Sequence, residues 1–318
     1  MKTIFIINPC AGKKDLSDSI SKTVRDAGKN ADIYITRSRG DAADFVKAYC
    51  EKNGPARFIA CGGDGTLSEV LCGVMECEGC EIGVIPSGTG NDFRRNFDKY
   101  LDFSDVNEQM TCTTVWCDAI KYTLTAGEHK ICGYCANMIN IGFDCNVASL
   151  TSRLKTKPFI RGSFAYFLSI LINLAGKKGA DLDIFLDGEK VHSGKLLLTS
   201  IANGCFCGGG IKSNPKACVL SGTMDINIIK DVPRGKFISL LPGYMKGTLH
   251  DKRGIENILL SKECRKISIV PRNGITDVCI DGEIFSAERA EFEVVNKAFD
   301  FAVPLKRVPG APPAEILN

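Results

Sequence analysis

The first 86 residues alternate between short apolar runs and helical patterns, and this alternation constrains the fold more than any other feature. Each apolar run is rich in β-branched or aromatic residues, which is typical of buried strands. Strands linked by helical crossovers run parallel, so the order predicts an α/β domain: a parallel sheet with helices on both faces. The expected strands span residues 2–8, 31–36, 57–61 and 82–86, and the expected helices span 15–28, 41–52 and 66–75.

After about residue 110 the pattern changes, and strand-like runs dominate. Asp187-Gly188 and Asp281-Gly282 are turn signals between strands. Helical stretches interrupt near 146–154 and 163–175. This half is predicted to be an antiparallel β-sandwich, with the domain boundary between residues 125 and 126. The expected strands span residues 119–125, 134–141, 181–186, 195–202, 224–229, 266–271, 276–280 and 291–295.

Charge and hydropathy exclude several classes of protein. The formal net charge is +3 and the pI is about 8.1, which is too mild for a dedicated nucleic-acid binder, so no nucleic-acid partner is expected. The most apolar stretch, Phe164–Ala175, is too short for a membrane span, and no secretory signal is visible. We therefore expect a cytoplasmic protein, which would be peripheral if it acts at a membrane.

The chain contains 16 cysteines, and most lie in apolar runs where cysteine acts as a small hydrophobic residue. Two CxxC pairs, Cys77/Cys80 and Cys132/Cys135, could in principle hold zinc. They are about 50 residues apart, whereas common zinc modules space their pairs by roughly 15–20 residues. A structural role is therefore favoured, and metal binding is left open.

A glycine-rich loop follows the third expected strand. It runs from Gly62 to Thr66 with the sequence GGDGT. Glycines at the carboxyl end of a parallel strand let main-chain N–H groups approach a phosphate, and the following helix adds its dipole. No lysine follows, so this is not a Walker A motif. A tight turn without a ligand is equally consistent with this loop alone.

A second polar loop, Pro86–Phe93, follows the fourth expected strand. Ser87 and Thr89 supply hydroxyl groups and Asp92 a carboxylate, while Asn91 alone could be a helix N-cap. Because parallel strands end at the same edge of a sheet, the two loops are expected to lie together. Two such loops, each with an aspartate, favour a phosphate-binding site more strongly than either alone.

These motifs resemble those of the diacylglycerol kinase catalytic family, especially its soluble bacterial lipid kinases. Weaker matches continue at Asn140–Asp144, Gly208–Ala217 and Asp281–Glu283, so the resemblance spans almost the whole chain. GGDGT alone is shared with NAD kinases and 6-phosphofructokinases, whereas the block IPxGTxNDF is more specific to lipid kinases. The main matches are Asn8-Pro9-x-Ala11-Gly12-Lys13, Gly62-Gly63-Asp64-Gly65-Thr66-Leu67-x-Glu69-Val70 and Ile85-Pro86-x-Gly88-Thr89-Gly90-Asn91-Asp92-Phe93.

The resemblance implies a kinase that uses ATP and Mg²⁺, with a nucleotide-binding domain at 1–125 and a lipid-substrate domain at 126–290. It also implies that the segment 291–318 returns to the first domain. Asp281 would be the general base, oriented by Glu283, while Asp64 and Asp92 would serve the nucleotide's magnesium and the polar network of the site. The implied nucleotide contacts are Asn8, Thr36, Gly62, Gly63, Asp64, Gly65, Thr66, Leu67, Ser68, Gly88 and Thr89.

One segment departs from the family pattern. Related bacterial lipid kinases carry a structural magnesium site in their second domain, and the matching stretch here is Cys218–Thr223, with Cys218, Ser221 and Thr223 at the ligand positions. Ser221 stands where the family has an acidic ligand. A neutral hydroxyl is a poor substitute in a site for a hard cation. Retention of this magnesium site is therefore doubtful.

Three functions remain open from the sequence. The first is an ATP-dependent lipid kinase, most readily one that converts diacylglycerol into phosphatidic acid at the membrane surface. The second is an NAD kinase-like enzyme, against which the block Pro86–Phe93 argues. The third is an inactive regulator that binds nucleotide or membrane. By base rates alone Asp281-Gly282 would be only a hairpin turn. Family members are often dimers, so a homodimer is an expectation.

Overall fold

A computed structural model describes the chain except residues 13–14, 16, 27–30, 144–178 and 307–318. Its contacts divide the chain into two units. The first comprises Met1–Asp118 and the C-terminal segment that begins at Lys297, and the second comprises Ala119–Asn296. Both changeovers fall inside long strands, β5 (Thr114–Ala126) and β15 (Arg289–Ala302), which also contain the boundaries expected from the sequence. The helices expected near 146–154 and 163–175 lie outside the described residues.

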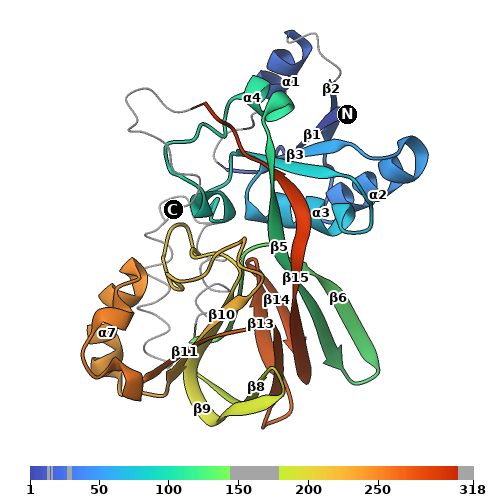
Figure 1. Ribbon diagram of the computed structural model, residues 1–318. Helices are drawn as coiled ribbons and strands as arrows, with labels where there is room; N and C mark the ends of the chain where they lie inside the picture. Colours follow the sequence, from blue (N-terminus) through green and yellow to red (C-terminus); the bar gives the residue numbers. More distant parts are fainter. Residues whose placement is uncertain (13–14, 16, 27–30, 144–178, 307–318) are drawn as a thin grey trace. The chain divides into compact units, whose positions relative to one another are not determined.

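The first unit is built on a parallel sheet. The strand order is β2-β1-β3-β4, and the end of β15 adds to β4 in parallel through Asp300 and Phe301 (Figure 1). The predicted parallel sheet is confirmed. Its elements are β1 (Thr3–Ile7), α1 (Ser17–Asp26), β2 (Ala31–Ile35), α2 (Asp41–Asn53), β3 (Arg57–Gly62), α3 (Asp64–Val74), β4 (Glu81–Pro86), a 3₁₀ helix (Phe93–Asn96) and α4 (Val106–Thr111).

Helices cover both faces of this sheet, as the alternating pattern predicts. All five residues of β1 are buried, and successive side chains point to opposite faces. On one face Phe5 packs with Ile20 of α1 and Val106 of α4. On the other face the ring of Phe58 meets the edge of Tyr49 from α2. A strand covered on both faces reads as a continuous apolar run, which is how β1 reads in the sequence.

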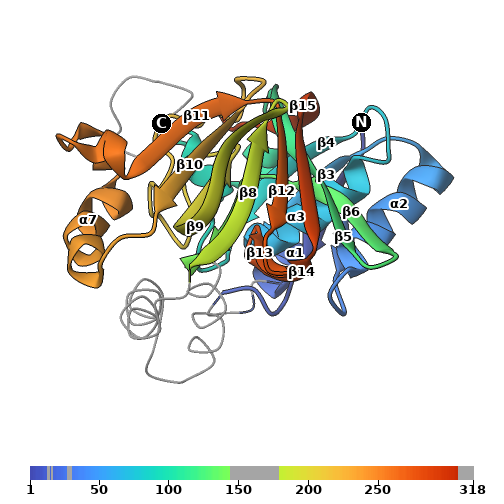
Figure 2. The ribbon, with the colours of Figure 1, turned by 90° about the horizontal axis from the view of Figure 1, so that it is seen from below.

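The second unit is an antiparallel β-sandwich, as predicted. Strand β9 is central: its first half pairs with β8 and its second half with β7 and β10, all antiparallel. Strand β12 then joins β8 to β15, and Figure 2 shows β9, β8, β12 and β15 side by side. The other elements are β5, β6 (His129–Cys135), β7 (Met138–Gly142), β8 (Ala180–Leu186), β9 (Glu189–Ala202), β10 (Met224–Lys230), α7 (Arg234–Lys246), β11 (Leu259–Cys264), β12 (Lys266–Pro271), β13 (Thr276–Ile280) and β14 (Glu283–Ala287).

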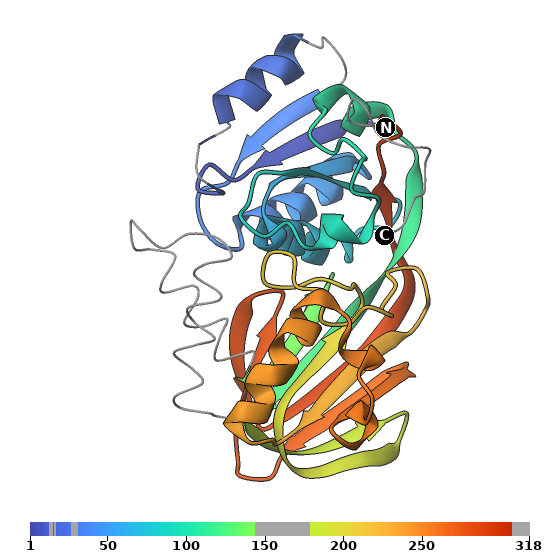
Figure 3. The same ribbon diagram turned by 90° about the vertical axis from the view of Figure 1, so that its left-hand side faces the viewer.

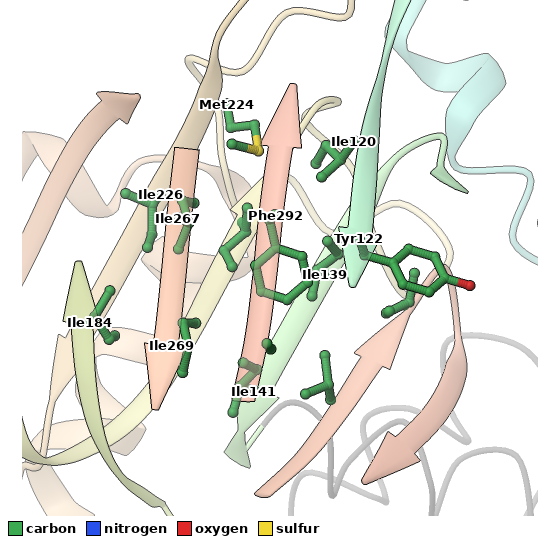
Figure 4. Packing of buried hydrophobic residues seen from close by; sticks show 14 of the residues in the cluster. Ile120, Tyr122, Ile139, Ile141, Ile184, Met224, Ile226, Ile267, Ile269 and Phe292 are labelled. Carbon is green, nitrogen blue, oxygen red and sulfur yellow. The ribbon is translucent and has the colours of Figure 1, made fainter. Parts of the chain in front are cut away.

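The core of this unit is filled by alternate residues of its strands. Ile139 and Ile141 of β7 and Ile267 and Ile269 of β12 point into one cluster with Phe292 of β15 (Figure 4). Each of these side chains is at most 2% exposed. Burial alternates along β12, as in a half-buried strand, whereas β7 is buried at all five positions.

Several details differ from the sequence-based expectation, which did not include α4, β11 or β14. Helix α7 was missed because Gly235, Pro242 and Gly243 interrupt its pattern, yet its Phe237 and Leu240 belong to a buried cluster with residues of β9. Figure 3 shows this helix lying along the strands. The single strand expected at 134–141 is two strands, since β6 ends at Cys135 and β7 begins at Met138. Among the described residues, no helix is long and apolar enough to span a membrane.

Candidate functional site

Three loops meet at the carboxyl ends of β1, β3 and β4, and they meet through glycines. A Cβ atom on Gly88 would lie 2.4 Å from the Cα of Gly63, and one on Gly12 would lie 2.0 Å from the carbonyl oxygen of Ser87. The N–H groups of Ser87 and Gly88 both donate to the carbonyl of Gly62, at 2.9 and 3.2 Å. Any side chain at these glycines would push the loops apart, which explains why all three loops require glycine.

The polar residues predicted to contact ATP lie at the same strand ends. Asn8 donates from Nδ2 to the hydroxyl of Thr66 at 3.1 Å, joining the end of β1 to the first turn of α3. Thr36 donates its main-chain N–H and its hydroxyl to the carbonyl of Ile7. Gly65 and Thr89 are exposed and Ser68 is partly exposed, whereas Leu67 is buried in the core. The side chain of Leu67 therefore serves packing, and only its main chain is left for ligand contact.

Asp64 fastens the GGDGT loop to the loop after β4. The structure begins α3 at Asp64, two residues earlier than expected, so this aspartate lies in the first helical turn. Its Oδ1 accepts the N–H of Asp92 at 2.7 Å and that of Phe93 at 3.2 Å. Part of its surface stays exposed, yet desolvation by burial raises the pKa of this carboxyl and outweighs the hydrogen bonds from Phe93 and Asp92.

Asp92 lies beside Asp64 with its carboxylate largely buried. A Cβ on Gly90 would lie 2.7 Å from Oδ2 of Asp64 and 3.3 Å from Oδ2 of Asp92, so both carboxylates face this glycine. Arg95 pairs with Asp92 at 3.5 Å and also donates to the carbonyl of Gly90. The predicted pair of aspartates is thus brought together, and an arginine that the sequence did not place at the site completes the cluster.

The loop after β4 is held by an aromatic anchor. Phe93 packs its ring against Phe97, Phe299 and Phe301 at centroid separations of 5.0–6.1 Å. Asn91 is not a helix N-cap: it adopts φ 53° and donates from Nδ2 to the carbonyl of Gly88 at 2.8 Å. Asp92 occupies the N-cap position of the 3₁₀ helix instead. The amide of Asn91 therefore shapes the glycine loop.

The two neighbouring carboxylates of Asp64 and Asp92 are suitable ligands for magnesium. Carboxylate oxygens are the protein ligands that Mg²⁺ accepts beside water and phosphate oxygens. Asp64 and Asp92 would hold such an ion, which would neutralise charge on a bound triphosphate. Within the described ranges, no group of three or more His, Cys, Asp or Glu side chains is arranged to hold a metal by itself. A nucleotide would therefore have to supply the remaining ligands.

In the second unit, Asp281 occupies the turn between β13 and β14. It has φ 45° and Gly282 has φ 93°, the left-handed pair of a tight hairpin turn. Its Oδ2 accepts the N–H of Ala136 at 2.7 Å. Its Oδ1 accepts the N–H groups of Asn137 and Met138, at 3.2 and 3.0 Å. These bonds explain why the expected strand 134–141 is broken, since its N–H groups turn away from the sheet toward this carboxylate.

Two further side chains accompany Asp281. The thiol of Cys135 donates to Oδ1 of Asp281 at 3.2 Å, and Cys135 is fully buried. Glu283 begins β14 opposite Ile280 and is partly exposed. The sequence identified Asp281 and Glu283 as candidates but showed Cys135 only as half of a CxxC pair. No sequence pattern links Cys135 to Asp281, because the two residues are 146 positions apart in the chain.

The residues at the doubtful magnesium site do not fit a metal. The hydroxyl of Ser221 lies 2.9 Å from the carbonyl oxygen of Cys218 and 3.1 Å from that of Thr223. The main-chain N–H of Ser221 also donates to Cys218. A hydroxyl thus closes this turn by hydrogen bonds, and no carboxylate of the turn is available as a ligand.

Asp225 does not replace the missing carboxylate. It is 3% exposed, and Asn214 donates from Nδ2 to both its carbonyl and its carboxylate. Burial raises the pKa of Asp225 to about 6, and the side-chain hydrogen bond from Asn214 offsets only part of this effect. Asp225 therefore belongs to a buried polar network that also includes Ser200.

Two family models together match most of the chain. Residues 2–116 match the family model "Diacylglycerol kinase catalytic domain", and residues 137–303 match "YegS C-terminal NAD kinase beta sandwich-like domain". A relative from Enterobacter sp. (strain 638), "Probable lipid kinase YegS-like", is 27% identical over 95% of this chain and 96% of its own. "Lipid kinase YegS" from Escherichia coli (strain K12) is 30% identical over 64% of this chain and 66% of its own.

Solved structures share the fold. A diacylglycerol kinase from Bacillus anthracis str. Sterne has a TM-score of 0.67 at 20% identity, covering 96% of this chain and 98% of its own. Yeast NADH kinase has a TM-score of 0.50 at 12% identity, covering 96% and 84%. Together with the two matched domain models, these findings confirm the resemblance inferred from the motifs: the chain belongs to the diacylglycerol kinase family, in the branch whose second domain is the YegS-type β-sandwich.

Proposed function

We propose that this protein is an ATP-dependent lipid kinase that transfers the γ-phosphate to the hydroxyl of diacylglycerol and forms phosphatidic acid. The observation that carries the proposal is the meeting of three glycine loops over Asp64 and Asp92. Their main-chain N–H groups and hydroxyls suit a triphosphate. A lipid acceptor is supported by the relative named "Lipid kinase YegS" and by the matched diacylglycerol kinase catalytic domain.

In this proposal the first unit binds ATP. Asn8, Thr36 and Thr89 add polar groups around the loops Gly62–Ser68 and Gly88–Gly90. Asp64 and Asp92 would hold Mg²⁺, which would neutralise charge on the phosphates. Phosphoryl transfer depends mainly on positioning and charge neutralisation, so a rigid set of loops is the appropriate device.

Asp281 of the second unit acts as the general base. The oxygen of the lipid hydroxyl forms a bond to the γ-phosphorus, the bond from that phosphorus to the β-phosphate oxygen breaks, and ADP leaves. The hydroxyl proton passes to the carboxylate of Asp281. Three main-chain N–H groups and one thiol fix this carboxylate, and Glu283 supports its orientation. The enzyme works at the membrane surface as a peripheral protein.

The test is transfer of labelled phosphate from ATP with magnesium. The acceptors are diacylglycerol, a sphingoid base and ceramide in mixed micelles, and NAD without lipid. Asp281→Asn is the test variant. Asp187→Asn is its matched control, because Asp187 sits in a turn of the same kind. We expect phosphatidic acid from the wild type, a loss of about 10²–10⁴-fold for Asp281→Asn, and activity within about twofold for Asp187→Asn.

Two results would overturn the proposal. Phosphorylation of NAD with no lipid product would make this chain an NAD kinase-like enzyme. Binding of ATP without transfer to any acceptor would make it a nucleotide-binding regulator. If lipid is phosphorylated equally well by the wild type and Asp281→Asn, the kinase assignment stands and the role of Asp281 is wrong.

A further inference from the structure

Three thiols of the first unit lie together, away from the glycine loops. Cys50 is near the end of α2, and Cys77 and Cys80 lie in the connection from α3 to β4. The Sγ atoms of Cys50 and Cys80 are 3.5 Å apart, and Cys50 also hydrogen-bonds with Cys77. The tertiary structure thus adds a third cysteine to the CxxC pair that the sequence displays.

The proposed kinase chemistry does not use this cluster, and it does not form a metal site. Within the part of the chain that the structure describes, no three metal-ligating side chains surround a common position. Cys77 directs its thiol to the carbonyl of Gly73 at 3.4 Å. Among the described residues, these thiols do not converge on a common metal position, and their proximity favours oxidation of the sulfurs.

Geometry and access both permit a disulfide. A disulfide bond is about 2.05 Å long, so the sulfurs of Cys50 and Cys80 need to approach by about 1.5 Å. Helices α2 and α3 are packed tightly, since a Cβ on Gly73 would lie 2.7 Å from Val46, which keeps the thiols close. Cys80 is 5% exposed, whereas Cys50 and Cys77 are partly exposed and open to small reagents.

We propose that Cys50 and Cys80 form a reversible disulfide, and that Cys77 can exchange into it by forming a disulfide with one of the two sulfurs and releasing the other as a thiol. With a low-molecular-weight disulfide such as oxidised glutathione, the Cys50 thiolate first forms a mixed disulfide and releases one glutathione thiol. The sulfur of Cys80 then displaces the second glutathione. Two protein thiols are oxidised, one glutathione disulfide is reduced to two thiols, and the thiol protons leave with them.

The surroundings make this a slow reaction at neutral pH. Burial is the largest cause that raises the pKa of the Cys50 thiol, and hydrogen bonds with Cys77 and Cys80 add to it. Burial also raises the pKa of Cys77. Because the thiolate is the attacking species, the rate of oxidation should increase as the pH rises. The cross-link would enclose β3 and α3, which carry the GGDGT loop.

The experiment is oxidation of the full chain with oxidised glutathione at pH 8, followed by alkylation of free thiols, tryptic digestion without reductant and mass spectrometry. Lys47 and Lys52 isolate Cys50 in a short peptide, whereas residues 58–93 contain no lysine or arginine, so Cys77 and Cys80 share another peptide with Cys61 and Cys72. We expect these two peptides to be linked. We also expect a rise in Tm of about 5 °C or more, reversed by dithiothreitol.

Cysteine-to-alanine variants identify which thiols form the disulfide. Cys50→Ala should abolish the linked peptides and the rise in Tm, and Cys132→Ala, which removes an exposed thiol of β6, should change neither. Cys80→Ala should move the link to Cys77. The proposal is wrong if Cys50 and Cys80 stay fully alkylatable while glutathione modifies only exposed thiols such as Cys10. It is also wrong if the link persists when Cys77 and Cys80 are both alanine.

Discussion

Two Asp-Gly turns of the second unit share a backbone and differ in their surroundings. Asp187-Gly188 has φ values of 48° and 89°, and Asp281-Gly282 has 45° and 93°. Each carboxylate accepts main-chain N–H groups from a neighbouring segment. The N–H groups that Asp187 accepts belong to Arg265 and Lys266, which are exposed. The N–H groups that Asp281 accepts belong to Ala136, Asn137 and Met138, which are at most 6% exposed.

The difference shows that an Asp-Gly pair determines the turn but not the use of its carboxylate. Asp187 ties the start of β12 to an exposed hairpin, where water could replace it. Asp281 fills a break between β6 and β7 whose buried N–H groups would otherwise lack a partner. Buried polar groups are costly to leave unpaired, so the same dipeptide has a larger structural role at Asp281. Its proposed catalytic role uses the fixed orientation that follows.

The largest expected effect is on stability when each carboxylate is removed. Asp281→Ala leaves three buried N–H groups unpaired and should lower the free energy of unfolding by about 3–5 kcal/mol. Asp187→Ala should cost less than half as much, because water can reach its donors. Urea unfolding monitored by circular dichroism measures both. Equal losses for the two variants would show that the two turns are equivalent.

A third carboxylate, Asp225, sharpens the comparison because it relies on side-chain donors, Asn214 and Ser261. Burial raises its pKa to about 6 from an ordinary 3.8. Its contribution to stability is therefore fully present below pH 3.8 and is lost as the pH rises through 6. Relative to Asp225→Asn, the wild type should lose up to about 3 kcal/mol between pH 4 and pH 7.

Unfolding curves at a series of pH values test this, with Asp183→Asn as the control. Hydrogen bonds from Ser193 and then Lys190 lower the pKa of Asp183, so its contribution has the opposite sign and is lost as the pH falls. A wild type whose stability follows that of Asp225→Asn at every pH would contradict the assignment to Asp225.

The smallest expected effect concerns the thiol of Cys135, which donates to Asp281. The donors described at Asp187 are main-chain N–H groups. Cys135→Ala should reduce kcat about three- to tenfold with the KM for ATP unchanged, because the thiol is a weak donor that orients the proposed base. Cys135→Ser, which keeps a donor, should recover most of the loss and restore the pH profile of kcat/KM. If alanine and serine behave alike, Cys135 acts only in packing.

Much of the fold could be predicted from the sequence because its signals are local. Runs such as Thr3–Ile7 are buried on both faces and read as continuous apolar segments separated by helical patterns, which marks the first unit. Some strands of the sandwich, such as β12, alternate between buried and more exposed residues. Helix α7 was missed because Pro242 and Gly243 hide its pattern, and only packing onto the sheet stabilises it. The break between Cys135 and Met138 was missed because its cause lies in a distant turn.

By itself, the sequence determined the order of elements in the first 86 residues and the glycine loops that carry Asp64 and Asp92, because periodicity and turn chemistry act over a few residues. Asp281 became a candidate only through the resemblance to the family. Only the tertiary structure decided how these residues are held. Asp64 binds the main chain of the next loop, Asp281 binds that of residues 136–138, and Cys50 joins a CxxC pair. These contacts join segments separated by 28 to 145 residues in the chain, and only folding brings such segments together.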